Sequence, residues 1–142
     1  MIFLSSYNEL SKRYGVFEED EIVGWLYLTA PNSEQPVADV FVYTLTEPIS
    51  EASVDRLKSE NGRGPPPLSR EYANELSVRT NVTEDDLSFE WSRDGESICL
   101  LIHTRPVAMI IKNKKRGYSV GLAYSGPYGE PWNAELFRLT FT

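Results

Sequence analysis

The sequence has one cysteine, Cys99, and therefore cannot form a disulfide within the chain. Small secreted domains commonly contain paired cysteines, so we expect a reducing compartment and a cytoplasmic protein. Long apolar runs are also missing: the longest, such as Ile98–Ile102, fall far short of the roughly 20 residues that span a bilayer. The apolar start stops at Ser5 with no basic segment before it, so we expect neither a signal peptide nor a membrane partner.

Residues that commonly perform catalysis are scarce. His103 is the only histidine, and no nucleophile motif accompanies it, so we expect an ordinary hydrogen-bonded histidine at a strand end. Cys99 lies between Ile98 and Leu100, where a buried thiol is unreactive. Residues 99 and 103 share one face of an expected strand but lie about 13 Å apart along it. We therefore predict no catalytic residue and no cofactor.

Complete nucleotide-binding motifs are absent as well. Gly62-Arg63-Gly64 lacks the third glycine of a dinucleotide site, and Gly126-Pro127-Tyr128-Gly129 lacks the lysine of a phosphate loop. One hairpin tip is basic, which protects sheet edges from pairing with other chains; its residues are Lys112, Lys114, Lys115 and Arg116.

Negative charge is what the sequence has in excess. The net charge of −7 divides into −11 over residues 1–96 and +4 over residues 97–142. Nonspecific nucleic-acid binding needs a basic face, so we expect no nucleic-acid partner, whereas a cationic protein would be attracted. Neither acidic run has the residue order of a calcium loop, and we predict no metal site. The candidate partner-binding acids are Glu18, Glu19, Asp20, Glu21, Glu84, Asp85 and Asp86.

The first half of the chain predicts mixed secondary structure within one domain, residues 1–142. Tyr7, Leu10 and Tyr14 have the spacing of a helical face, which predicts a helix over residues 6–14. Aromatic and branched residues predict strands over 22–28 and 37–45. Ser50 begins an expected short helix that Asn61-Gly62 closes.

Residues that interrupt or begin helices and strands are concentrated in the middle of the chain. Three successive prolines in the segment 62–67 exclude a helix or a central strand, so we expect a surface loop there. Ser69 then caps an expected helix over residues 69–78, with Leu68, Tyr72 and Leu76 at a spacing of four. Thr83 has the position of a cap for a first turn made by Glu84, Asp85 and Asp86.

The last third predicts a four-strand antiparallel meander over residues 88–92, 97–103, 107–112 and 118–124, joined by short turns. Asn133 would cap a terminal helix that Leu136, Phe137 and Phe141 hold against the sheet. The expected fold class is α+β: an antiparallel sheet of about five or six strands including this meander, with short helices packed on one face.

Three aromatic residues near glycines and prolines form a second candidate partner-binding group. Tyr124, Tyr128 and Trp132 lie outside the expected regular strands. Aromatic side chains are enriched at protein interfaces, so an exposed recognition patch is one interpretation, and filling of the core is the other.

In general character the chain resembles bacterial toxin-neutralising immunity proteins, which are small, acidic, cytoplasmic α+β proteins without active-site motifs. The resemblance implies a noncatalytic module that sequesters a cationic protein partner; it implies no particular site residues. Two other hypotheses remain open. One is a small-ligand or enzyme domain with a pocket near His103, and the other is a structural subunit whose sheet edge pairs with a copy of itself.

Overall fold

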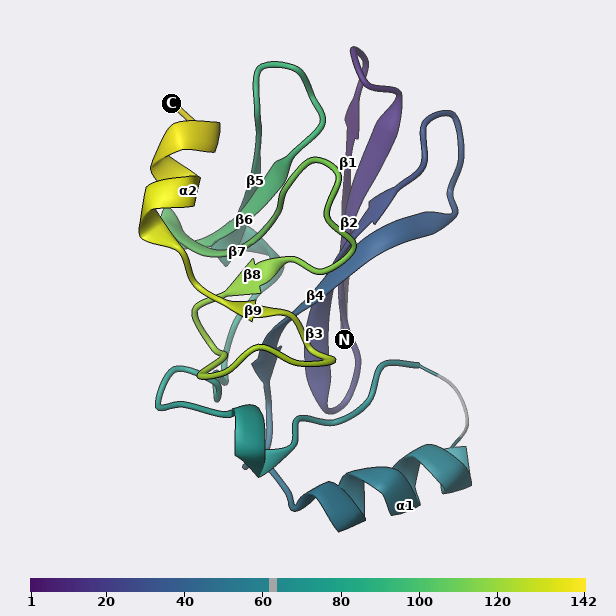
Figure 1. Ribbon diagram of the computed structural model, residues 1–142. Helices are drawn as coiled ribbons and strands as arrows, with labels where there is room; N and C mark the ends of the chain where they lie inside the picture. Colours follow the sequence, from purple (N-terminus) through teal and green to yellow (C-terminus); the bar gives the residue numbers. More distant parts are fainter. Residues whose placement is uncertain (62–63) are drawn as a thin grey trace.

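The computed structural model describes residues 1–61 and 64–142, most of which belong to two β-sheets (Figure 1). The first sheet is fully antiparallel, in the order β1 (Ile2–Asn8), β2 (Arg13–Glu19), β3 (Val23–Thr29) and β4 (Pro36–Thr44). The second contains β5 (Leu87–Trp91), β6 (Ile98–Ile102), β7 (Arg105–Ile110), β8 (Tyr118–Ser119) and β9 (Glu130–Pro131), with only the β8–β9 pair parallel. The α+β class is thus broadly confirmed, but two sheets replace the expected single sheet.

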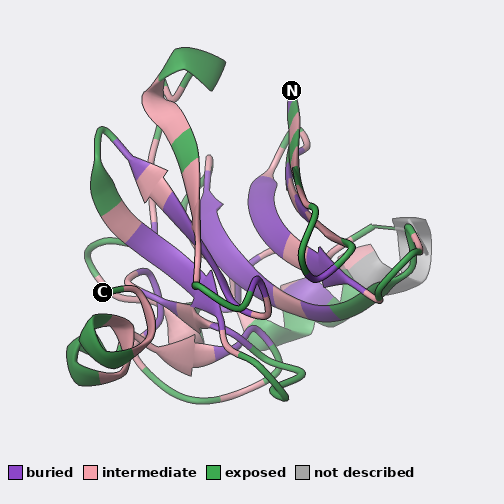
Figure 2. Ribbon diagram, turned by 90° about the horizontal axis from the view of Figure 1, so that it is seen from above, coloured by how far each residue is buried: buried purple, intermediate pink, exposed green. Residues whose placement is uncertain are grey.

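The main hydrophobic core lies between the two sheets. Period-two alternation in each strand directs one set of side chains inward, including Phe17, Leu26 and Val40 from the first sheet and Leu100 and Ile110 from the second. All five are completely buried. Figure 2 shows the buried residues along the strands of both sheets and the exposed ones in loops and in α2 (Ala134–Thr140). Burying both inner faces against each other holds the sheets together.

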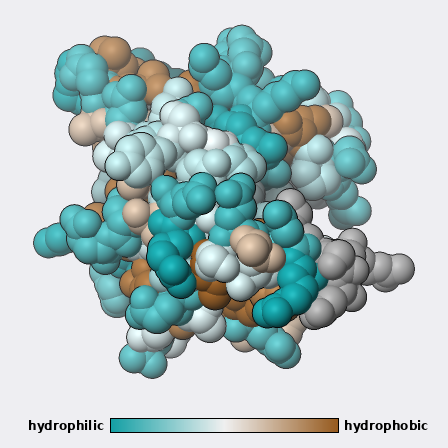
Figure 3. Space-filling model, turned by 60° about the horizontal axis from the view of Figure 1, so that its bottom comes forward, coloured by the Kyte–Doolittle hydropathy of each residue, from teal (hydrophilic) through white to brown (hydrophobic). Residues whose placement is uncertain are grey.

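The helices cover little of either sheet. Helix α1 (Glu51–Asn61) begins as expected after Ser50 and inserts Val54 into the interior. Helix α2 is capped by Asn133, whose side chain accepts from the Leu136 N–H at 3.0 Å, as predicted, yet none of its residues is buried. Figure 3 views the end where α1 lies: hydrophilic residues cover most of this face, and hydrophobic ones appear in separate small areas.

The helix predicted over residues 6–14 is wrong, because this segment forms the β1–β2 hairpin. Tyr7 and Tyr14 are cross-strand partners with ring centroids 4.8 Å apart, so their sequence spacing is that of a hairpin. The Asn8 side chain stabilises the turn by accepting from the N–H groups of Leu10 and Ser11 at 3.0 Å each. Local side-chain bonds of this kind compete with helix formation.

The helix predicted over residues 69–78 is also wrong beyond its first turn. Ser69 does act as a cap, but the helical segment is a 3₁₀ turn, Arg70–Tyr72, followed by extended backbone at Ala73. Tyr72 packs against another aromatic ring, and Ala73 pairs with Leu122 in an isolated bridge. Tertiary packing has overridden the local periodicity here.

The predicted meander is present as β5 to β8, but its last strand is short. Pairing in β5–β6, β6–β7 and β7–β8 is antiparallel, and β8 contains only Tyr118 and Ser119 where the pattern predicts residues 118–124. The strands predicted over 22–28 and 37–45 are confirmed as β3 and β4. In the loop predicted over 62–67, Gly62 and Arg63 lie outside the described residues, and residues 64–67 belong to no helix or strand.

Candidate functional site

In the part of the chain that the structure describes, no nucleophile and base come together around His103. This residue lies in a turn with a φ of 51°, its side chain is 72% exposed, and Nδ1 is 3.6 Å from Asp86 Oδ1. Cys99 is fully buried, and burial raises the pKa of its thiol. A protonated buried thiol is a poor nucleophile. Among the side chains that the structure describes, no three or more of His, Cys, Asp or Glu are placed to hold a metal ion.

The first acidic run is divided between the two faces of the first sheet. Glu18 points outward, whereas Glu19 is 6% exposed and accepts a hydrogen bond from the Tyr43 hydroxyl at 2.5 Å. Asp20 Oδ1 accepts from the N–H groups of Ile22 and Val23 at 2.8 Å each and so shapes the β2–β3 turn. Glu19, one of the candidate partner-binding acids, is therefore buried rather than exposed, because neighbouring strand residues face opposite ways.

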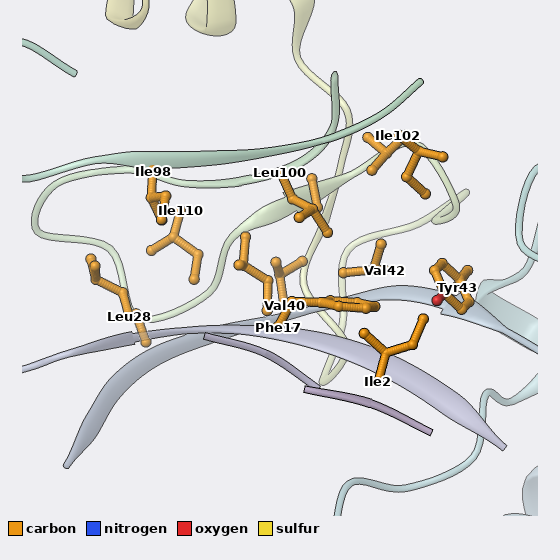
Figure 4. Close-up of a cluster of buried hydrophobic side chains, with 14 residues drawn as sticks. Ile2, Phe17, Leu28, Val40, Val42, Tyr43, Ile98, Leu100, Ile102 and Ile110 are labelled. Carbon is orange, nitrogen blue, oxygen red and sulfur yellow. The ribbon is translucent and has the colours of Figure 1, made fainter. Parts of the chain in front are cut away.

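The second acidic run forms a single 3₁₀ turn, Glu84–Asp86, directly after Thr83 as predicted. Glu84 and Asp85 are exposed. Asp86 accepts from the Thr83 N–H at 2.9 Å, and this bond, with a smaller contribution from His103, lowers the pKa of Asp86. Leu87 follows this turn and pairs with Ile102 of the second sheet. Figure 4 shows Ile102 above Tyr43 and Ile2, which belong to the first sheet. Both acidic runs thus lie at one end of the sandwich but on different sheets.

The three candidate aromatic residues do not form a common exposed patch. Tyr128 is 3% exposed; its hydroxyl donates to the Pro67 carbonyl at 2.8 Å and accepts from the Ser69 N–H at 3.0 Å. Its ring belongs to a second buried cluster, which also contains Val23, Trp25, Phe41, Leu68 and Leu122. Trp132 packs against Phe137 of α2, and Tyr124 alone is exposed. The interpretation as core filling is therefore the correct one for Tyr128.

An aromatic hollow lies on the outer face of the first sheet. We call it the outer hollow. Its volume is about 560 Å³, and all four strands and the β3–β4 loop contribute to it. The sheet register places outward-facing residues of neighbouring strands side by side, such as Ser5, Val16 and Tyr27. The full lining is Phe3, Ser5, Tyr14, Val16, Glu18, Tyr27, Thr29, Glu34 and Pro36.

Negatively charged side chains lie in and near the outer hollow. Burial, followed by the charges of Glu18, Asp39 and Asp20, raises the pKa of Tyr27 to about 12. Asp39 is neutralised by Arg116, whose Nη1 lies 2.5 Å from its Oδ1. Among the described residues, neither Glu18 nor Glu34 has a cationic group within 4.0 Å. These two carboxylates are therefore available to an external cation beside a floor of aromatic rings.

The basic hairpin tip is partly neutralised by its neighbours. Lys112 Nζ lies 3.7 Å from Asp94, and Arg116 bonds Asp39 as described. Lys114 and Lys115 line a separate, smaller hollow of about 350 Å³ together with Arg13 and Glu96, themselves an ion pair at 3.0 Å. Carboxylates therefore compensate Lys112 and Arg116, whereas the exposed Lys114 and Lys115 have no carboxylate within 4.0 Å among the described residues.

Sequence reasoning predicted Glu18 as a site residue but missed Phe3, Tyr14, Tyr27 and Glu34. The available signal was alternation: Phe3, Ser5 and Tyr7 on one side of the turn and Tyr14, Val16 and Glu18 on the other. Read as two strands, these residues share one face. The helical interpretation of residues 6–14 concealed that face.

The Tyr27 hydroxyl offers a direct measurement of this local potential. We expect Glu18→Gln to lower the pKa of Tyr27, because it removes the negative charge that contributes most to the raised pKa and so makes the phenolate less unfavourable. NMR titration of protein carrying ¹³C-labelled tyrosine would measure it. Glu84→Gln removes the same charge at the second acidic run and should leave the Tyr27 titration unchanged. An equal shift in both variants would mean that Glu18 acts only through net charge.

Comparison with other proteins gives no family or relative: no family model, no curated protein and no solved structure matches the chain. The part of the chain that the structure describes contains no helix long and apolar enough to cross a membrane.

Proposed function

We propose that the protein is a noncatalytic binding module whose outer hollow receives a cationic protein partner. The observation that carries this proposal is the combination of two unpaired carboxylates, Glu18 and Glu34, with aromatic side chains in one open hollow. An arginine or lysine side chain of the partner would pair with a carboxylate while its apolar stem lies against the rings of Tyr14 and Tyr27.

The charge of the whole molecule supports the same partner chemistry. A net charge of −7 accelerates the encounter with a cationic surface, while the hollow determines where the partner docks. Binding of this kind would neutralise or sequester the partner, as in the toxin-neutralising immunity proteins that the chain resembles in general character. A reducing, cytoplasmic location fits the single unreactive thiol of Cys99.

The hypothesis of an enzyme or ligand domain near His103 receives no support from the site geometry. The His103 side chain projects into solvent and lines none of the hollows described above.

A short arginine-rich peptide serves as the probe for the proposed site. In an NMR titration of ¹⁵N-labelled protein, we expect the largest shifts at amides of β2 and β3 around Glu18 and Tyr27. Glu18→Gln/Glu34→Gln should weaken binding about tenfold, because each rim ion pair contributes up to about 1 kcal/mol. Affinity should fall as salt rises, since the attraction is between exposed charges.

Glu84→Gln/Asp85→Asn is the matched control, because it changes the net charge equally at two exposed carboxylates outside the outer hollow. It should bind the peptide nearly as well as the wild type. Equal weakening by both double variants, or shifts spread evenly over the surface, would refute a localised site. Equilibrium unfolding of each variant would verify that the folded state is intact.

A further inference from the structure

The two edges of the first sheet differ in how their backbone groups are used. Strand β4 is closed by the rest of the chain: Asp39 N–H donates to Lys115, Phe41 N–H to Tyr128 and Thr44 N–H to Ser77. In the described part of the chain, strand β1 has β2 as its only ladder neighbour. Outside that ladder, the one backbone bond found in β1 is the turn bond from Lys12 N–H to the Asn8 carbonyl.

The hydrogen bonds of strand β2 show which backbone groups of β1 point away from the sheet. Tyr14 N–H donates to Thr29 Oγ1 at 2.9 Å, and Asp20 N–H donates to the Val23 carbonyl at 2.9 Å, so even-numbered residues here direct their N–H groups toward β3. The N–H and C=O groups of odd-numbered β2 residues therefore point toward β1, where the partner residues are Ser6, Leu4 and Ile2. It follows that the backbone groups of residues 3, 5 and 7 point away from the sheet.

The side chains along this edge leave it unprotected. Phe3 is 62% exposed and Tyr7 is 44% exposed, and Ser5 between them is also exposed. Strand β1 is seven residues long and contains no charged residue and no proline, and its pairing with β2 has no bulge. Proteins normally use charged residues, prolines or bulges to prevent edge pairing. Because β1 has none of these, its edge is suited to receive another strand.

We propose that β1 pairs antiparallel with β1 of a second copy of this chain, about a two-fold axis through Ser5. This register alone pairs all seven residues of both strands, and it aligns the outward-pointing backbone groups of residues 3, 5 and 7 in hydrogen-bonded pairs. Phe3 lies opposite Tyr7 of the second copy, so two exposed aromatic residues become a cross-strand pair twice.

The resulting dimer has a continuous eight-stranded sheet, in which the two outer hollows lie on one face because Phe3 and Ser5 line each of them. The two copies each carry −7 and repel one another, so added salt should strengthen dimerisation. Binding of a cationic partner should weaken with salt. Because salt acts on dimerisation and on partner binding in opposite directions, the failure of one association can be distinguished from the failure of the other.

Cysteine cross-linking tests the register. Residues opposite each other in a hydrogen-bonded antiparallel pair have Cα atoms about 5.5 Å apart, within the range of a disulfide. Because Cys99 is buried, a thiol introduced by Ser5→Cys is the reactive one. We expect mild oxidation of Ser5→Cys to give a covalent dimer. Ser88→Cys, an exposed position on the edge strand β5 of the other sheet, is the matched control and should remain mostly monomeric.

Charge substitution tests the same pairing without a covalent bond. In Phe3→Lys/Tyr7→Lys, lysines face each other across the interface, and we expect the dissociation constant to rise about tenfold or more by sedimentation equilibrium, although the net charge per copy is smaller. In Phe3→Lys/Tyr7→Glu, each lysine faces a glutamate, and dimerisation should recover. A wild-type protein that stays monomeric at high concentration and high salt, or equal cross-linking at positions 5 and 88, would overturn the proposal.

Discussion

Gly129→Ala is expected to destabilise the protein by about 3 kcal/mol, a fall of roughly 10 °C in melting temperature. Gly129 has a φ of 131°, which side-chain-bearing residues rarely adopt. A Cβ atom there would lie 2.7 Å from Val40 Cγ2 and 2.8 Å from the Gly117 carbonyl oxygen. That carbonyl is held by the N–H of Glu130 at 2.8 Å, so it cannot retreat without weakening the β8–β9 pairing.

Gly64→Ala separates the two causes of this loss. Gly64 also has a positive φ, 80°, but a Cβ atom there would meet no described residue within 4 Å. The backbone strain alone should cost about 1 kcal/mol. Chemical denaturation of both variants would give the comparison. Equal losses at the two positions would show that the contacts with Val40 and Gly117 contribute nothing to the effect at Gly129.

Much of the second sheet could be predicted from sequence because its signals are local. Phe89 and Trp91 alternate with polar residues, and a glycine with a φ of 72° at position 95 closes the next turn. The β1–β2 hairpin escaped prediction because Tyr7 and Tyr14 satisfy helical spacing as well as cross-strand pairing. Only the partner strand distinguishes the two, and a single sequence does not identify that partner.

The candidate site was predictable to a smaller extent for a related reason. The acidic run 18–21 was visible in the sequence, but its division between faces depends on Glu18 and Glu19 being in a strand. The burial of Tyr128 depends on contacts with residues far away in the chain, such as Pro67 and Trp25. Long-range packing of this kind leaves no periodic pattern in the sequence, so aromatic composition alone could not separate surface from core.

Tyr43→Phe should cost about 2–3 kcal/mol of stability through the loss of one hydroxyl group. Tyr43 is fully buried and donates to Glu19, which is 6% exposed. Without the hydroxyl, the one partner left to the Glu19 carboxylate among the described residues is the amino group of Met1, 3.8 Å away, and the carboxylate is too buried to recover full hydration. Urea unfolding would measure the loss, with Tyr124→Phe as control, because the Tyr124 side chain is 66% exposed and should change stability little.

Alkaline pH gives the same pair an independent signature. Burial, then the hydrogen bond and charge of Glu19, raises the pKa of Tyr43, so its phenol stays protonated in the folded state. In the unfolded chain tyrosine ionises with a pKa of about 10. The contribution of Tyr43 is therefore complete below pH 10 and is lost as the pH rises above it, so the stability gap between wild type and Tyr43→Phe should narrow there. Tyr27, with its pKa of about 12, destabilises both proteins equally in this range and cancels from the gap. A gap that stays constant above pH 10 would contradict a raised pKa of Tyr43 in the folded state, because both proteins keep the ring and the gap reports the hydroxyl group alone.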